Sequence, residues 1–459
     1  MVEAAASADI AAAPGLAAPA GDTVLSPGRR NYVIILLMIA YTLSFLDRQV
    51  LSILVEPIKA DLHLKDTDIG LLTGPVFVIF YTFLGVPIAW LADRASRPWI
   101  ISASLALWSG FTALSGVATG FATLGLARLG VGFGEAGCNP SSHSLIADIS
   151  RPDQRASGLA FYSMGVPIGT LLGLAMGGLI ADAYGWRVAF MVAAAPGLLL
   201  ALIIALTVRE ARPSKPFGAA TLARSLMQPL ADLVDTVKAL AGKPTFWFVA
   251  VGCGFSAFVG YAQLFFTASF FLRCHAPEVA QIAAGFGLKS KGFLGPALGV
   301  MTALGGLTGT LVGGQIADRA VGRDRRAFMS VPAILALGSI PFVFVLFTVK
   351  STWGALALDF VPNVVATIWY GAGYSTAQSV VAPHRRATAA ALLLLILNLI
   401  GLGLGPTFLG VCSDFLANNQ HLGSAEGLRW AMIVTSCFGV VAAGFFWLAR
   451  RTIREDVVS

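Results

Sequence analysis

Five ionisable side chains lie within long apolar runs of this sequence, where a charge is costly to bury. They are Asp47, Arg48, Arg128, Glu135 and Asp359. A charge placed in hydrocarbon costs about 3 kcal/mol or more, so such residues are functional candidates by default. A buried carboxylate can take up and release a proton, whereas arginine stays charged and can anchor an anion. These residue types therefore predict proton exchange beside an anion-binding arginine.

Helical geometry brings three of these residues together. If the first apolar run crosses a bilayer from residue 31, Asp47 lies about 24 Å along it. Arg128 lies about 10 Å into the antiparallel fourth run, which is a similar depth in a hydrocarbon core about 30 Å thick. Glu135 follows Arg128 by seven residues, so two helical turns return it to nearly the same face. We expect Asp47, Arg128 and Glu135 to form one cluster, with Gly132 leaving room for substrate or water.

Two interpretations of this cluster are open. In the first, arginine keeps a carboxylate ionised until substrate draws the arginine away and the carboxylate takes a proton. In the second, a permanent ion pair packs the two helices. Arg48 is a further candidate for the proton and substrate site, although it points about 100° away from Asp47 around the helix. Asp359 lies nearer the end of its run and is left out of the cluster.

The elements that must position these residues are membrane helices. Of 459 residues, 56% are hydrophobic and 12% are charged, which is about half the charge of a soluble domain. This composition excludes a soluble enzyme, a disordered chain and a nucleic-acid binder. Twelve apolar runs are long enough to span a bilayer: 31–55, 69–92, 98–118, 121–147, 155–181, 186–208, 245–272, 294–317, 327–349, 353–381, 385–416 and 426–449. We predict an all-α integral membrane protein with twelve transmembrane helices.

Lysine and arginine give the predicted orientation of these helices. If the N-terminus is inside, 21 of the 29 loop Lys and Arg residues lie on the cytoplasmic side. Cytoplasmic loops carry such an excess of positive charge. We therefore expect both termini in the cytoplasm and the chain in a bacterial inner (plasma) membrane.

The chain divides into two halves of six runs each. We assign 1–28 to a disordered tail, 29–208 to the N-terminal half, 209–244 to a cytoplasmic linker, 245–451 to the C-terminal half and 452–459 to a cytoplasmic tail. Apolar residues recur every three or four positions in the linker. This spacing predicts an amphipathic helix that lies on the membrane surface.

Sequence motifs repeat between the two halves. Residues 91–97 read LADRASR, and residues 316–323 read IADRAVGR. Further on, the pair Gly178 and Asp182 matches Gly410 and Asp414 at an offset of 232 residues. Duplicated halves of this kind are typical of transporters whose site lies between the halves, near the middle of the membrane.

The repeated loops resemble the signature of the major facilitator superfamily, over about residues 30–450. Leu46-Asp47-Arg48 in the first run, and ARLGVGFGEA at 127–136 in the fourth, resemble the Spinster branch of that superfamily. Spinster members are associated with export of sphingolipids or lysolipids, and at least some are coupled to protons.

The resemblance also implies a conformational latch at the signature loops. In such proteins the loop acids, here Asp93 and Asp318, meet a positive helix end across the interface between the halves. Arg94, Arg97 and Arg155 are further candidates for this latch. The resemblance implies in addition that the fifth and eighth runs face each other.

Both of these runs carry glycine at every fourth position: Gly169, Gly173 and Gly177 in the fifth, and Gly305, Gly309 and Gly313 in the eighth. Such rows let helices approach closely. We expect the two rows to form a smooth sliding contact between the halves, with ordinary helix packing as the alternative.

The resemblance implies a secondary active transporter that moves an amphipathic, lipid-like molecule by alternating access, coupled to protons. A proton-coupled drug or organic-anion carrier is an alternative. A membrane enzyme or receptor is a distant one, because the five histidines are scattered singly. We expect no enzymatic activity, no cofactor, no metal and no nucleic-acid partner. The expected partners are the substrate, protons and membrane lipids, and the expected state is a monomer.

Overall fold

The computed structural model describes residues 25–92, 95–210, 234–321, 326–382 and 385–457. Within these ranges the chain is almost entirely helical and has no strand, and every one of the predicted apolar runs is helical. Among the described residues, 9 helices are long and apolar enough to cross a membrane. The all-α fold of an integral membrane protein is therefore confirmed.

The N-terminal half contains ten helical segments. They are α1 (Pro27–Ile53), α2 (Val55–Leu62), α3 (Asp66–Thr73), α4 (Pro75–Ala92), α5 (Arg97–Ser115), α6 (Phe121–Glu135), α7 (Cys138–Ile149), α8 (Arg155–Ser163), α9 (Gly165–Tyr184) and α10 (Trp186–Thr207), with a short 3-10 turn η1 (Pro152–Gln154) before α8.

The C-terminal half follows the same plan. Its segments are α12 (Pro244–Cys274), α13 (Ala276–Gly285), α14 (Ser290–Val321), α15 (Ala327–Thr348), α16 (Thr352–Ser379), α17 (Arg386–Leu397), the π-helical η3 (Asn398–Leu404), α18 (Gly405–Asn418) and α19 (Gly423–Asp456).

Among the described residues, the second, fourth and fifth predicted spans are each broken into two helices, the fifth at Met164, and the eleventh is interrupted by the π-helical η3. The second run is split at Gly74 into α3 and α4, because Pro75 has no backbone N–H with which to continue the helix. The fourth is split at residues 136–137 into α6 and α7, and the third is the single helix α5. The break at residues 136–137 makes Glu135 the last residue of α6.

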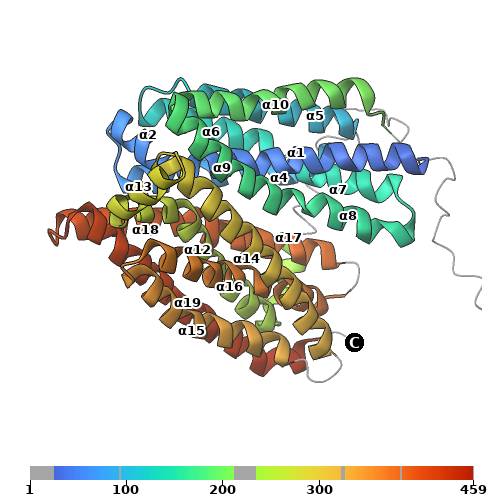
Figure 1. The fold of residues 1–459 in the computed structure, drawn as a ribbon. Coiled ribbons are helices and arrows are strands. Elements are labelled where there is room, and N and C mark those ends of the chain that lie inside the picture. The colour runs from blue at the N-terminus through green and yellow to red at the C-terminus, as the bar shows by residue number, and fades with distance from the viewer. Residues whose placement is uncertain (1–24, 93–94, 211–233, 322–325, 383–384, 458–459) are drawn as a thin grey trace, which may run out of the picture.

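The two halves meet at one end of the molecule. Figure 1 shows the N-terminal half in blue and green and the C-terminal half in yellow to red, with their helices converging near α2 and α13 and diverging toward the end where the C-terminus lies. We call the first end the joined side and the second the terminal side. Helix α9 packs along α14, and α3 packs along α18.

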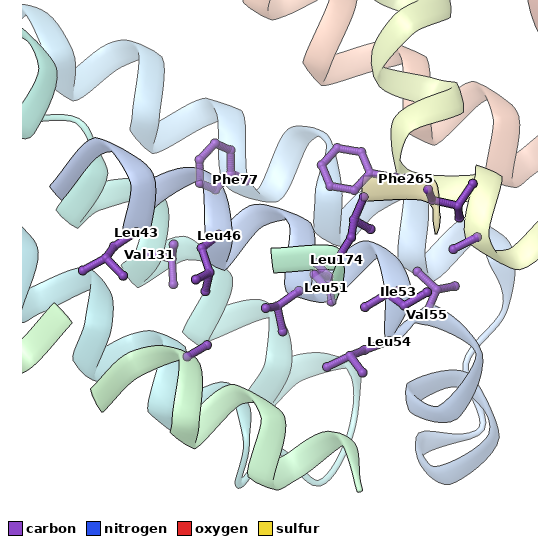
Figure 2. Packing of buried hydrophobic residues seen from close by; sticks show 14 of the residues in the cluster. Leu43, Leu46, Leu51, Ile53, Leu54, Val55, Phe77, Val131, Leu174 and Phe265 are labelled. Carbon is purple, nitrogen blue, oxygen red and sulfur yellow. The ribbon is translucent and has the colours of Figure 1, made fainter. Parts of the chain in front are cut away.

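The buried apolar residues follow the same division. One cluster runs from Leu46 of α1 and Leu174 of α9 to Phe265 of α12, so it includes both halves (Figure 2). A second cluster includes Phe246 and Trp369. Its residues come from the C-terminal half, together with Leu240, which precedes α12. The halves therefore share one apolar core on the joined side and have separate packing elsewhere.

The glycine rows do not face each other, so that expectation is wrong. The fifth-run row packs on α1, where a Cβ at Gly173 would lie 2.6 Å from the carbonyl oxygen of Leu46. The eighth-run row packs on α16, where a Cβ at Gly305 would lie 2.6 Å from Cβ of Asn363. Close approach is used for permanent packing within each half. Helices α9 and α14 do meet, but through Gly178 and Gly295.

The ends of the halves differ from the sequence boundaries. Helix α1 begins at Pro27, and α19 continues to Asp456, past the predicted end of the last span. The reason is that the Asp456 carboxylate accepts a hydrogen bond of 2.8 Å from the backbone N–H of Thr245, which ties the helix end to α12. Residues 1–24 and 211–233, with most of the predicted tail and linker helix, lie outside the described residues.

Candidate functional site

The four residues predicted for the proton and substrate site lie on two helices of the N-terminal half. Asp47 and Arg48 belong to α1, and Arg128 and Glu135 to α6. Their exposed fractions are 1%, 9%, 2% and 2% respectively. Four ionisable groups are therefore buried in one half, and we call this set the central cluster.

Arg48 and Glu135 form the ion pair of the central cluster. Arg48 Nε donates to Glu135 Oε2 at 2.7 Å, and a guanidinium Nη also contacts that oxygen. The guanidinium carbon lies 4.8 Å from the ring centroids of both Phe77 and Tyr81 on α4. Cation–π contacts therefore supplement the single carboxylate. The other oxygen, Oε1 of Glu135, is buried with no hydrogen-bond partner among the described residues.

Asp47 and Arg128 do not pair with each other, which corrects the pairing expected from depth. Asp47 Oδ2 accepts a hydrogen bond of 3.0 Å from Thr112 of α5, and its Oδ1 is buried without a partner in the described chain. The guanidinium carbon of Arg128 lies 5.3 Å from the ring centroid of Phe77, the ring that Arg48 also contacts. Nε of Arg128 is buried without a hydrogen-bond partner among the described residues. Equal depth was a poor guide because it leaves the direction of each side chain around the helix undetermined.

Close packing of α6 fixes the place of these side chains. A Cβ at Gly132 would lie 2.6 Å from the carbonyl oxygen of Phe77, and one at Gly134 would lie 2.6 Å from the backbone nitrogen of Trp108. Glycine thus lets α6 fit between α4 and α5. The expectation that Gly132 leaves room for substrate or water is wrong, because a helix backbone fills that space.

Asp359 is buried elsewhere, on α16 of the C-terminal half, with 4% of its surface exposed. Its Oδ2 accepts a hydrogen bond of 3.1 Å from Asn363, one turn along the same helix. In the parts of the chain that the structure describes, no group of three or more His, Cys, Asp or Glu is placed to hold a metal ion.

The predicted latch residues are only partly described. Asp93 and Arg94 lie outside the described residues, and of Asp318 only the backbone, in α14, is described. Arg155 is exposed at the start of α8.

Arg97 is fully buried and donates to Asp148 of α7 at 2.8 Å and to Glu210 after α10. Asp148 belongs to its own half, and Glu210 follows that half at the start of the predicted linker. In this conformation Arg97 fastens helices within the N-terminal half and does not bridge the two halves.

Sequence reasoning missed a charged network on the joined side. Arg273, at the end of α12, donates to Glu56 at 2.7 Å and to both oxygens of Asp66, at 2.8 and 2.7 Å. Asp66 also pairs with Lys59 and accepts from Ser413 of α18 at 2.7 Å. One C-terminal arginine is therefore held by two N-terminal carboxylates.

Asp66 stands just before the predicted span 69–92, where water can reach the helix ends. Burial raises the pKa of its carboxyl, but the hydrogen bonds and charge of Arg273, together with Lys59, outweigh burial and hold the pKa well below its usual range. Asp66 is therefore ionised in this conformation at any physiological pH.

Two aspartates cap helix starts across the interface. Asp414, near the end of α18, accepts hydrogen bonds from the backbone N–H groups of Asp66 and Thr67, at 3.3 and 2.8 Å. Asp182, near the end of α9, accepts from the N–H of Gly292 at 2.5 Å and pairs with Lys291 at 2.7 Å. Carboxylates at a helix N-terminus satisfy free N–H groups and meet the positive end of the helix dipole.

These two caps are equivalent positions of the internal repeat. The matching spacing of Gly178 to Asp182 and Gly410 to Asp414 was the signal in the sequence that could have found them. We call the contacts of Arg273, Asp66, Glu56, Asp414 and Asp182 the joined-side network.

Comparison with known proteins agrees with this architecture. Residues 37–406 match the family model of the Major Facilitator Superfamily. An MFS-type efflux pump of Mycolicibacterium smegmatis is 30% identical over 438 residues, which cover 94% of this chain and 95% of the pump. Protein spinster homolog 1 of Homo sapiens is 28% identical, covering 92% of this chain and 81% of that protein.

A solved structure is similar over nearly the whole chain. It is a bacterial homologue of the human lysosomal transporter Spinster in an inward-facing, unoccupied conformation, with a TM-score of 0.81 and 32% identity over 95% of this chain and 100% of that one. The matched family model covers most of the chain, and the relatives cover nearly all of it. The chain therefore belongs to the Major Facilitator Superfamily, as a multi-pass membrane transporter of the Spinster branch.

Proposed function

We propose that this transporter moves an amphipathic, lipid-like molecule with an anionic group, of the sphingolipid or lysolipid class, in exchange for or together with protons. Kinship with the Spinster proteins supports the substrate class. The observation that carries the proposal is the state of the central cluster. It holds two guanidinium groups against one aromatic ring, and only Arg48 has a carboxylate partner.

Arg128 is the proposed anchor for the anionic group. A guanidinium binds phosphate or carboxylate through two parallel hydrogen bonds, and Nε of Arg128 has no protein partner among the described residues. An anion that enters beside Phe77 would also attract Arg48, whose guanidinium rests on the same ring.

Glu135 and Asp47 are the proposed proton carriers. A carboxylate buried in hydrocarbon is stable as an anion only while a cation is close. If substrate draws Arg48 away, Glu135 loses that cation and takes a proton, and the neutral site crosses between the two access states at lower cost. Asp47 has a hydroxyl partner and no ion-pair partner within 4 Å in the described chain, so it offers a second protonation position.

Alternating access requires the joined side to separate and the terminal side to close. We propose that both termini are cytoplasmic, so the conformation described here is inward-facing. The predicted latch of Asp93, Arg94, Arg97, Asp318 and Arg155 would then stabilise the opposite, outward-facing state. The substitution Asp93→Asn should shift the balance toward the inward-facing state while leaving the affinity for substrate unchanged, measured by spin-label distances and ligand titration.

Efflux of drugs is a second candidate function. It is favoured by the relative in Mycolicibacterium smegmatis, which is described as an efflux pump. Drug efflux would use the same central cluster for coupling to protons. The two functions therefore differ in the substrate that is bound and share the proposed coupling.

Transport in proteoliposomes with and without a pH gradient tests the proposal. The substrates are a fluorescent lysophospholipid, a sphingoid phosphate and a cationic dye. Glu135→Gln and Asp47→Asn should each reduce the response to the gradient at least tenfold, and Arg128→Ala should also weaken substrate binding. Asp61→Asn is the matched control, because Asp61 is an exposed acid paired with Arg187.

Two results would contradict parts of this proposal. If the carboxylate variants respond to the gradient like wild type, the central cluster is structural and carries no proton. If only the dye is transported, the lipid substrate is wrong and drug efflux is the function.

A further inference from the structure

A small polar cavity lies between the two halves, on the joined-side flank of the central cluster. Its volume is about 40 Å³, which is enough for roughly three water-sized groups. The polar side chains that line it come from four helices: Ser52 of α1, Gln263 and Thr267 of α12, Thr302 of α14, and Asp359 and Asn363 of α16. Both halves therefore contribute to its wall.

The cavity contains one buried carboxylate. Asp359 is 4% exposed, and among the ion pairs of the described residues none joins it to a lysine or arginine. Its Oδ2 accepts from Asn363, and no protein donor within the described chain reaches its Oδ1. A buried anion without a cation is costly, so this group needs either a proton or a positive ligand.

Both amides of the cavity have free oxygens, because their orientation is fixed by hydrogen bonds from their nitrogens. Asn363 Nδ2 donates to the backbone oxygen of Asp359 at 2.7 Å, and a carbonyl oxygen can only accept. Gln263 Nε2 donates to Ser436 Oγ at 2.9 Å, and that hydroxyl directs its own hydrogen to Met432 O at 2.7 Å. Neither amide can be reversed without losing a hydrogen bond, so both oxygens stay free.

The hydroxyl groups give the same result. Ser52 Oγ donates to Gln49 O at 2.8 Å, and Thr267 Oγ1 donates to Gln263 O at 2.8 Å. Each therefore keeps only lone pairs for the cavity. With the carboxylate and two amide oxygens, the lining offers mainly acceptors and a negative charge. The uncommitted hydrogens among its polar side chains are those of the Thr302 hydroxyl and the second N–H of Gln263.

We propose that this cavity is a binding site for a small monovalent cation, either an alkali ion or the primary ammonium group of a substrate. An ammonium group brings three N–H donors to a lining of acceptors. The alkali ions are bound by the same oxygen ligands. The ammonium arm rests on the proposed function and refines it, because it assigns an anionic end of the substrate to Arg128 and a cationic end to Asp359.

The cavity lies about one helical turn from the central cluster along α1. Ser52 lines the cavity and follows Arg48 by four residues, which is about 6 Å along α1. We therefore expect a zwitterionic amphiphile, with its anionic and amine groups joined by a short linker, to engage both regions.

Thermal unfolding of the purified full-length transporter in sodium-free detergent buffer tests the site without any transport step. One arm titrates sodium chloride against choline chloride at constant ionic strength. The other titrates n-octylammonium against n-octyltrimethylammonium, which has the same chain and charge but no N–H donor. Stabilisation by sodium identifies an inorganic ion, and stabilisation by n-octylammonium alone identifies an amine.

Variants assign the effect to the cavity. Asp359→Asn should weaken the apparent affinity for the stabilising cation at least tenfold, and Gln263→Leu should weaken it less. Asp61→Asn is the control, because it removes an exposed carboxylate that pairs with Arg187 and does not line the cavity, so it should leave the affinity unchanged.

The proposal is overturned if neither cation stabilises the wild-type protein, since Asp359 is then a neutral, protonated acid. It is also overturned if Asp359→Asn and Gln263→Leu retain the wild-type affinity for the stabilising cation, as the control Asp61→Asn does. Neither result bears on proton coupling at the central cluster, so failure of this site and failure of the proposed function are separate outcomes.

Discussion

The central cluster and the joined-side network both bury charge. The cluster lies within the N-terminal half, whereas the network crosses the boundary between the two halves. The Arg48–Glu135 pair joins two helices of one half. Arg273 joins the C-terminal half to Glu56 and Asp66 of the N-terminal half. A pair within one half can persist while the halves move, so a ligand or proton must change it. Bonds between the halves must break in every cycle of alternating access.

The surroundings of the two regions match these roles. The joined-side network is built at helix ends, where separated charges can be hydrated again at low cost. The central cluster lies against aromatic rings, where a charge that loses its partner is not readily hydrated. The four predictions below test this contrast, beginning with the largest expected effect.

Loss of Arg48 should destabilise the fold most. Arg48→Ala leaves Glu135 buried without a cation, which costs about 3–5 kcal/mol. The double variant Arg48→Met with Glu135→Leu removes both charges and should recover most of that stability. Chemical or thermal unfolding in detergent measures both. A double variant as unstable as Arg48→Ala would show that the charges themselves are not the cause.

Loss of Arg273 should change conformation more than stability. Arg273→Gln removes charged hydrogen bonds, each worth about 1.5–3 kcal/mol, from the joined state only. The fraction of molecules open on the joined side should rise at least tenfold. Spin labels at Lys65 and Asn419, in a cysteine-free background, report the separation.

Arg187→Gln is the control for this experiment, because its partner Asp61 belongs to the same half. An unchanged distance distribution in Arg273→Gln would remove the arginine from the conformational balance.

The two aspartate caps should act equally and independently. Asp414→Ala and Asp182→Ala each leave helix-start N–H groups without an acceptor, at a cost of about 1 kcal/mol to the joined state. Because the caps lie at separate helix pairs with no shared partner, the double variant should show the sum of the two shifts. The same spin-label pair measures it, and a strongly non-additive result would mean that the two contacts open as one unit.

The pH response should separate the two regions. The pKa of Asp66 is lowered in the joined state and returns toward about 3.9 when the halves separate. Its contribution to the joined state is therefore fully present above the ordinary pKa and is lost as the pH falls below it. Between pH 8 and 5 the joined-side network should be constant, so Asp66→Asn should leave any shift of the spin-label distances in that range unchanged. If such a shift is instead abolished by Asp66→Asn, the assignment of the two regions is wrong.

Much of the fold could be predicted from local sequence, because each membrane helix must satisfy its own backbone hydrogen bonds in hydrocarbon. Apolar run length predicted the long helices, but not the short helices α2 and α13, which lie between the predicted runs. The breaks beside Gly74 and at residues 136–137 were missed, since local hydropathy does not change there. The halves' ends were also misplaced, because Asp456 is tied to Thr245 by a contact between distant residues.

The site was predicted less completely. Asp47, Arg48, Arg128 and Glu135 were found from the cost of burying charge, which depends only on residue type and surroundings in the chain. Their pairing was not, because Asp47 and Arg128 have similar depth but point to different neighbours, Thr112 and Phe77. The residues of the joined-side network were interpreted as ordinary loop charges. An acidic residue in a loop and an acidic residue that caps a helix look the same in the sequence.

The sequence by itself determined that this chain is a helical membrane transporter with buried charge in its first half, because hydrophobic length and charge cost act within single segments. Only the tertiary structure decided which charges meet, where the halves join, and that Asp359 faces a cavity of acceptors. Those outcomes depend on rotation about each helix axis and on contacts more than 80 residues apart, such as Arg48 with Glu135 at a separation of 87. Neither quantity is encoded in the pattern of any single segment.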